Sequence, residues 1–143
     1  MDKSRAKVGL LGLMLQLYET FPELNPAMAE FASELAGTLS PFADVDLPGI
    51  CKTRAEVDRA IAHFETQDVD LIVVVLLTYA PSHIALSGLL RTRLPILIYN
   101  TQRLRAITPD TLAIDTTRNH GMHGVQDLAN VLTRAGRPFH LVT

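Results

Sequence analysis

The stretch DLIVVVLL, residues 70–77, carries the strongest strand signal in this chain of 143 residues. It is short, β-branched and apolar throughout, which is typical of a central parallel strand buried on both faces. Two further short apolar runs, KVGLLGL at 7–13 and PILIYN at 95–100, have the same character. A weaker strand is expected at 43–47 and a last one at 139–142. These five segments predict the strands of one parallel sheet.

Helical patterns separate the strands. Apolar residues recur at helical spacing in four segments, which predict helices at 26–39, 53–67, 82–93 and 124–135. The first helix is expected to begin at Asn25 and Pro26, the second at the capping-box pair Thr53 and Glu56, and the third at Pro81 or Ser82. Gly136 is expected to end the last helix. The segment 102–119 is polar and irregular, and it leaves room for a short strand at 112–114.

The alternation of strands and helices decides the fold class. It predicts an α/β fold, a flavodoxin-like (Rossmann-like) open parallel sheet of about five strands with helices on both faces. The length suits a single domain over residues 1–143. The chain stops at Thr143, directly after an apolar strand run, so either Thr143 ends an edge strand or a longer protein has been cut there. We expect the second, a chain truncated at its C-terminus.

Composition excludes several classes of partner. The formal charge is -2, with acids and bases mixed along the chain, whereas nucleic-acid binding needs a clustered basic face. The longest apolar run, 71–77, is far shorter than the roughly 20 residues that span a bilayer. The polar stretch 1–7 is followed by no signal region, and the lone Cys51 rules out an internal disulfide. We therefore expect a cytoplasmic protein that binds neither nucleic acid nor membrane.

Ligands of such a fold bind in loops beyond the carboxyl ends of the strands. The predicted loops are 14–22, 50–53, 78–83, 100–103 and 119–124. Gly9 and Gly12 do not form a phosphate-binding motif, which disfavours a nucleotide or flavin site. Cys51 lies beside Lys52 near a helix start, a setting that can lower a thiol pKa, but with no arranged base an unreactive thiol is expected. No serine nucleophile motif or paired carboxylates are evident.

The loop Asn119-His120-Gly121-Met122-His123-Gly124 is the most specific local feature. Two histidines lie three residues apart, between glycines that permit unusual backbone angles. Three interpretations stay open at this point: a metal site, a catalytic or substrate-binding histidine, and a histidine that caps the following helix. A metal needs three or four ligands, and His120 and His123 supply two, with Asp127 as a third if the helix begins early.

Several of these loops match a known family in order and spacing. The matching segments are LMLQLYE at 13–19, VVVLLTYAPSHIALSGL at 73–89, PILIYNTQ at 95–102 and NHGMHGVQDLANVL at 119–132. Together they resemble the N-terminal domain of the L-arabinose isomerase family and its L-fucose isomerase-like relatives, over nearly the whole chain. The resemblance implies an aldose–ketose isomerase that acts through an ene-diol with a divalent metal, usually Mn²⁺. It also implies that later domains, with no counterpart here, hold that metal on two glutamates and two histidines.

In the family, the N-terminal domain lends one wall of the sugar site to a neighbouring subunit of a homo-oligomer. The resemblance places His123 at a substrate-contacting histidine, His120 where the family carries a glutamine, and Tyr79 where it carries a phenylalanine. The expected sugar-binding residues are Gln16, Leu17, Tyr79, Asn119, His120 and His123, with no catalytic residue, metal ligand or cofactor in this chain. The departures at His120 and Tyr79 leave the identity of the sugar open. The alternative is a stand-alone flavodoxin-like module that binds a small molecule or a protein without catalysis.

Overall fold

The computed structural model of the protein describes residues 5–143, so residues 1–4 of the polar N-terminal stretch lie outside it. Its strands are β1 (Ala6–Leu13), β2 (Ala43–Asp46), β3 (Ile50–Cys51), β4 (Leu71–Leu76), β5 (Ile96–Tyr99) and β6 (His140–Val142). They form one sheet in the order β2-β1-β4-β5-β6, with β3 also paired to β1, and all pairs are parallel. Apart from the short β3, this is the 2-1-3-4-5 order of flavodoxin-like folds. The predicted fold class is confirmed.

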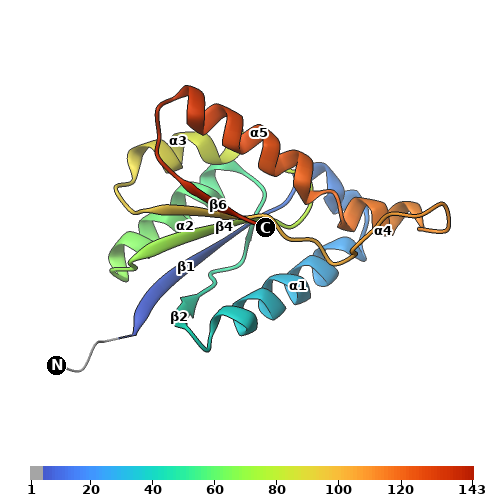
Figure 1. Ribbon diagram of the computed structural model, residues 1–143, viewed down its shortest axis with the longest axis horizontal. Helices are drawn as coiled ribbons and strands as arrows, with labels where there is room; N and C mark the ends of the chain where they lie inside the picture. Colours follow the sequence, from blue (N-terminus) through green and yellow to red (C-terminus); the bar gives the residue numbers. More distant parts are fainter. Residues whose placement is uncertain (1–4) are drawn as a thin grey trace.

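Helices cover both faces of the sheet (Figure 1). They are η1 (Gln16–Thr20, a 3-10 helix), α1 (Leu24–Leu39), α2 (Arg54–Thr66), α3 (His83–Arg91), α4 (Ala113–Arg118) and α5 (Gly121–Arg134). Helices α2, α3 and α5 pack on one face, while α1 packs on the other. None of the helices in the described part of the chain is long and apolar enough to cross a membrane.

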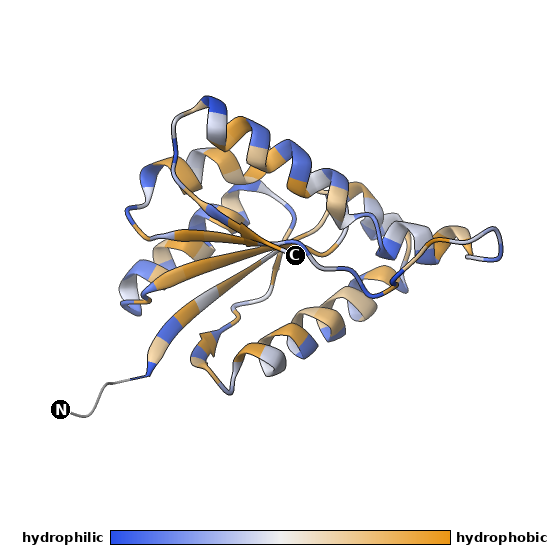
Figure 2. Ribbon diagram, in the orientation of Figure 1, coloured by the Kyte–Doolittle hydropathy of each residue, from blue (hydrophilic) through white to orange (hydrophobic). Residues whose placement is uncertain are grey.

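Strand β4 forms the centre of the sheet, between β1 and β5. Ile72, Val74 and Leu76 contact the α2, α3 and α5 layer. Val73 and Val75 contact the α1 layer. Burial on both faces explains why the strand is apolar at every position rather than at alternate ones, as the unbroken apolar colour of the central strands in Figure 2 shows. Each such buried side chain contributes roughly 1.5–3 kcal/mol to folding.

A close helix–sheet contact explains Gly9, which sequence analysis noted only as part of a missing phosphate loop. A Cβ at Gly9 would lie 2.6 Å from Cγ of Phe64, which is fully buried in α2. The glycine therefore lets α2 approach β1. The same helix begins with the predicted capping box, in which Thr53 Oγ1 accepts from Glu56 N (3.3 Å) and Glu56 Oε2 accepts from Thr53 N (2.8 Å).

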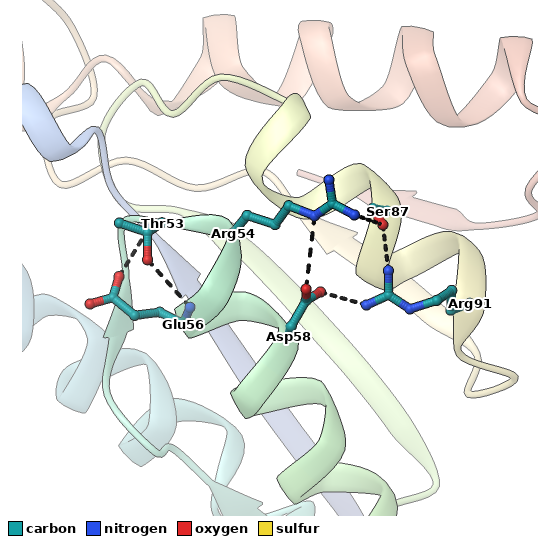
Figure 3. A network of polar contacts seen from close by, with 6 residues as sticks. All are labelled: Thr53, Arg54, Glu56, Asp58, Ser87 and Arg91. Carbon is teal, nitrogen blue, oxygen red and sulfur yellow. Dashed lines mark hydrogen bonds and ion pairs between the residues drawn. The ribbon is translucent and has the colours of Figure 1, made fainter.

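A polar network joins α2 to α3 on the exposed side of this layer (Figure 3). Asp58 lies between two arginines, 2.7 Å from Arg91 and 3.8 Å from Arg54. Both arginines also donate to the hydroxyl of Ser87. Below it, Gly88 lets the two helices approach, because a Cβ there would lie 2.7 Å from Ile61 Cδ1. Since exposed ion pairs each contribute at most about 1 kcal/mol, we ascribe the α2–α3 contact mainly to packing.

Two local predictions were wrong, and a third held for the position of the residue but not for its hydrogen bond. The short strand expected at 112–114 is instead the start of α4, where the N–H groups of Asp115 and Thr116 both donate to the carbonyl of Leu112. Helix α1 begins at Leu24, so Asn25 does not cap it, and the amide oxygen of Asn25 accepts from Lys52 Nζ instead. Ser82 is the N-cap residue of α3, but its side chain makes no capping hydrogen bond. In each case a local signal was outweighed by neighbouring backbone or by a distant side chain.

The start of α5 differs most from the prediction. The helix begins at Gly121, three residues before the predicted start at Gly124. His120 is therefore its N-cap residue, and His123 lies in its first turn. Residues three apart in a helix lie on one face, so the early start brings the two histidines together. At the other end, Gly136 has a φ of +68°, and it ends the helix as predicted.

Candidate functional site

The crevice at the carboxyl edge of the sheet lies where the strand order reverses, between β1 and β4. The loops that follow these two strands are joined there, because the hydroxyl of Thr78 accepts from Leu15 N at 3.2 Å. The Tyr18 side chain of η1 lies beside Tyr79 of the second loop. Burial, and then the proximity of Tyr79, raises the pKa of Tyr18. Tyr18 and Tyr79 thus place two aromatic side chains at this edge of the sheet.

A row of three rings continues from this edge onto α5. The ring centroids of Tyr79 and His120 are 6.1 Å apart, and those of His120 and His123 are 4.4 Å apart in an edge-to-face arrangement. Three predicted sugar-binding residues from two distant segments therefore lie side by side. His120 occupies the N-cap position, but its imidazole makes no capping hydrogen bond, so a capping role for that ring is not supported.

The environment of His120 favours its neutral form. Burial, and then the neighbouring His123, lowers the pKa of His120. A neutral imidazole has one N–H donor and one nitrogen acceptor, whereas the protonated ring only donates. At neutral pH His120 can therefore both donate a hydrogen bond to a ligand oxygen and accept one from a hydroxyl.

The glycines of the histidine loop bring α5 against the end of β4. A Cβ at Gly121 would lie 2.1 Å from the carbonyl oxygen of Leu76, and one at Gly124 would lie 3.1 Å from the side chain of the same residue. Neither glycine has a positive φ, so the expectation that they supply unusual backbone angles was wrong. Their function is close packing, and it fixes the position of His120 and His123 over the sheet edge.

A cavity of about 360 Å³ opens beside the two histidines. It is lined by Gln102, Leu104, Arg105, Ala106, Ile107, Thr116, Asn119, His120, Met122 and His123. Gln102 comes from the loop after β5, one of the five loops that were predicted to face the ligand. Its Nε2 donates to Asn100 Oδ1 at 2.8 Å, which orients its amide group.

Asn119, another predicted sugar-binding residue, lines this cavity but is already engaged. Its Oδ1 accepts from Leu104 N at 2.8 Å, and its Nδ2 donates to Leu104 O at 3.2 Å. These two bonds hold the segment 104–107 against the start of α5 and so form one wall of the cavity. Arg105 and the rest of that segment were not predicted as site residues, because the segment has no periodicity and no motif.

Gln16 and Leu17, the remaining predicted sugar contacts, lie on η1 and do not line this cavity. Both are exposed, and Leu17 is 67% accessible. The structure therefore brings Tyr79, Asn119, His120 and His123 together and leaves the η1 pair outside that group.

The proposed third metal ligand is engaged elsewhere. Helix α5 does begin early, as the metal interpretation required, but Asp127 Oδ2 accepts from Ser82 N at 2.9 Å. Asp127 thus satisfies an N–H group at the start of α3. Within residues 5–143, no group of three or more His, Cys, Asp or Glu side chains is placed to hold a metal ion.

Cys51 is an unreactive thiol. It is buried, and that burial, together with Glu56, raises its pKa to about 11, although Arg59 acts in the opposite direction. The neighbouring Lys52 does not lower the thiol pKa, because its Nζ lies 2.5 Å from Glu19 Oε1 and donates to an asparagine as well. The expectation of an inert cysteine holds, while the idea of an activating environment was wrong.

No family model and no curated protein matches the chain. Among solved structures, it is similar to the lac repressor dimer bound to operator and the anti-inducer ONPF, at 14% sequence identity and a TM-score of 0.43. The match covers 98% of this chain and 48% of that one, so the chain spans about half the length of that protein. A similarity of this strength says nothing about what the protein binds.

Proposed function

We propose that the chain is the sugar-binding N-terminal domain of an aldose–ketose isomerase of the L-arabinose and L-fucose isomerase-like type. The observation that carries this proposal is the row of Tyr79, His120 and His123 at the carboxyl edge of the sheet, beside a cavity of about 360 Å³. The three residues are the ones that the sequence resemblance associates with sugar contacts. A cavity of this size is at the lower end of the range for small-molecule sites.

The chemistry of the lining suits a polyhydroxylated ligand. The neutral imidazole of His120 can exchange hydrogen bonds in both directions with a hydroxyl, and the amide of Gln102 adds another donor and acceptor. Tyr79 lies next to His120 but outside the lining, and it would offer an aromatic face to a sugar that extends past His120. In this proposal His123 binds the substrate, while Asn119 positions the cavity wall and does not bind sugar.

The proposal assigns no chemical step to this chain. A divalent metal such as Mn²⁺ would polarise the sugar oxygens during the isomerisation. The described residues do not offer a ligand set for it, so we propose that other domains supply the metal ligands and the acid–base pair. We further propose that the wall formed by α5 completes a site in a neighbouring copy of the protein. Isomerisation by the isolated chain with Mn²⁺ would contradict this division of labour.

Binding to the isolated chain tests the proposal. We expect aldopentoses and ketopentoses to shift the imidazole NMR signals of His120 and His123, with saturation at millimolar concentration. His123→Ala should weaken this binding about tenfold, as expected for one lost hydrogen bond of about 1.4 kcal/mol. His140→Gln, an exposed histidine on β6, is the matched control and should bind as the parent does. Equal binding by His123→Ala and the parent would refute the assigned site.

A further inference from the structure

Among the described residues, the cavity beside the histidine pair has no acidic side chain in its lining. Three of its lining side chains are basic, namely Arg105, His120 and His123. Hydroxyl groups of a neutral sugar are donors as well as acceptors, and carboxylates are the strongest acceptors that a protein can offer them. The lining has no such group. Beside the groups that can bind sugar hydroxyls, the lining therefore offers a charged donor, Arg105, that suits a ligand group which only accepts hydrogen bonds.

Arg105 is the key residue, because its charge is not neutralised. Arg103, two residues away, lies 2.7 Å from Glu34 and 3.7 Å from Glu30. Arg118 lies 3.1 Å from Asp115. Within residues 5–143, by contrast, no ion pair involves Arg105. A guanidinium on a cavity wall without a carboxylate partner favours an anion.

A second cavity of about 230 Å³ adjoins the first across the wall formed by Leu104 and Asn119. Arg103 and Arg118 line it. The Nε atom of Arg118 is buried, and it has no hydrogen-bond partner among the described residues. A buried charged donor without an acceptor is rare in folded proteins and commonly marks a place for a water or an ion. Asp115 lines this second cavity as well, and both of its arginines are paired with acidic side chains, so the uncompensated guanidinium is that of Arg105, on the side of the histidine pair.

We propose that the cavity beside His120 and His123 binds a sugar that carries an anionic group, a phosphate ester or a carboxylate, and that Arg105 binds this group. This inference rests on the proposed sugar-binding function and adds the class of sugar. Charge-assisted hydrogen bonds from a guanidinium to phosphate or carboxylate oxygens are shorter and about twice as strong as neutral ones. The open N-terminus of α5 adds a favourable potential on the same side.

The experiment compares four probes by isothermal titration calorimetry with the 143-residue chain at low ionic strength: D-ribose, D-ribose 5-phosphate, D-ribonate and inorganic phosphate. We expect the phosphorylated or the carboxylated sugar to bind at least about tenfold more tightly than D-ribose. The stronger of these two identifies the anionic group. Arg105→Gln should abolish the preference for the anionic sugar over D-ribose, while Arg105→Lys should retain part of it.

The control is Arg93→Gln. Arg93 is also exposed, but it lies between α3 and β5, at the amino-terminal edge of the sheet. The Arg93→Gln variant should keep the full preference for the anionic sugar over D-ribose.

Equal affinity for D-ribose and both anionic sugars would overturn the inference and keep the sugar-binding function. Binding of inorganic phosphate that requires Arg105 but gains nothing from the sugar would support the anion site and overturn the sugar-binding function. Binding of none of the four probes would overturn both.

Discussion

Replacement of Gly121 by alanine tests how the histidine pair is held in place. A Cβ at this position would lie 2.1 Å from the carbonyl oxygen of Leu76, whereas ordinary contacts begin at 3.4 Å, so helix or strand must move by the difference, about 1.3 Å. The strand side cannot yield easily, since Leu76 ends the central strand and is buried. Overpacking of this kind costs up to about 3 kcal/mol. The better helix propensity of alanine stabilises the helix by at most about 1 kcal/mol, so the free energy of unfolding should fall by about 2 kcal/mol.

Urea unfolding followed by circular dichroism measures this loss of free energy, and thermal unfolding followed in the same way measures the melting temperature. The melting temperature should fall by about 4–8 °C, since 1 kcal/mol corresponds to about 2–4 °C for a chain of this size. Gly37→Ala is the matched control, because Gly37 lies within α1 and a Cβ there would meet nothing within 4 Å. It should stabilise the protein by about 0.5–1 kcal/mol.

The same two variants separate packing from site geometry. In Gly121→Ala, displacement of α5 should shift the imidazole NMR signals of both His120 and His123, and Gly37→Ala should leave them in place. If Gly121→Ala proves as stable as the parent with unshifted imidazole signals, then the contact with Leu76 does not fix the start of α5. Our account of the glycines in the histidine loop would then be wrong.

Three further predictions concern single groups. His123→Asn should raise the pKa of His120 toward the ordinary value in an NMR titration, and an unchanged His120 titration would refute the coupling. In the parent, the urea midpoint should fall as the pH drops below about 6.5, because the unfolded chain then binds more protons at His120 than the folded chain does. Cys51, with a pKa of about 11 and 4% exposure, should not react with a thiol reagent at pH 8 until the protein unfolds, and rapid labelling of the native protein would contradict its burial. Asp127→Ala should destabilise the protein by about 1–2 kcal/mol through the lost bond to Ser82 N, whereas Asn130→Ala, an exposed position on the same helix, should have little effect.

The fold was predictable because its signals are continuous. The central strand β4, Leu71–Leu76, is apolar at every position, since both of its faces are buried, and the capping box of Thr53 and Glu56 is a local motif that is present in the structure. Strand β3 escaped prediction because it has only two residues, Ile50 and Cys51, and it exists through its pairing with β1. A pattern of two residues has no measurable periodicity.

The walls of the candidate site were less predictable because distant contacts place them. The segment after β5 is directed by Arg103, which binds two glutamates of α1 and lies 5.5 Å from the ring centroid of Phe31, about seventy positions earlier in the chain. Nothing local in the sequence indicates such a contact. Arg105 reaches the cavity as a consequence, so a residue with no motif of its own becomes the principal charge in the candidate site.

The histidine loop also shows how a correct choice of residues can rest on an incorrect reason. Its glycines were expected to free the backbone, yet both have ordinary backbone angles, and they are small because α5 begins against the Leu76 carbonyl. That contact starts the helix at Gly121, and the early start places His120 and His123 one turn apart on one face. The two imidazole rings are therefore paired, and the pKa of His120 is lowered. The same cavity holds Arg105 and, within the described part of the chain, has no acidic side chain in its lining. An anion bound at Arg105 would favour protonation of the His120 imidazole, so anion binding should be accompanied by proton uptake below neutral pH, measurable as a buffer-dependent heat in the same calorimetric titration.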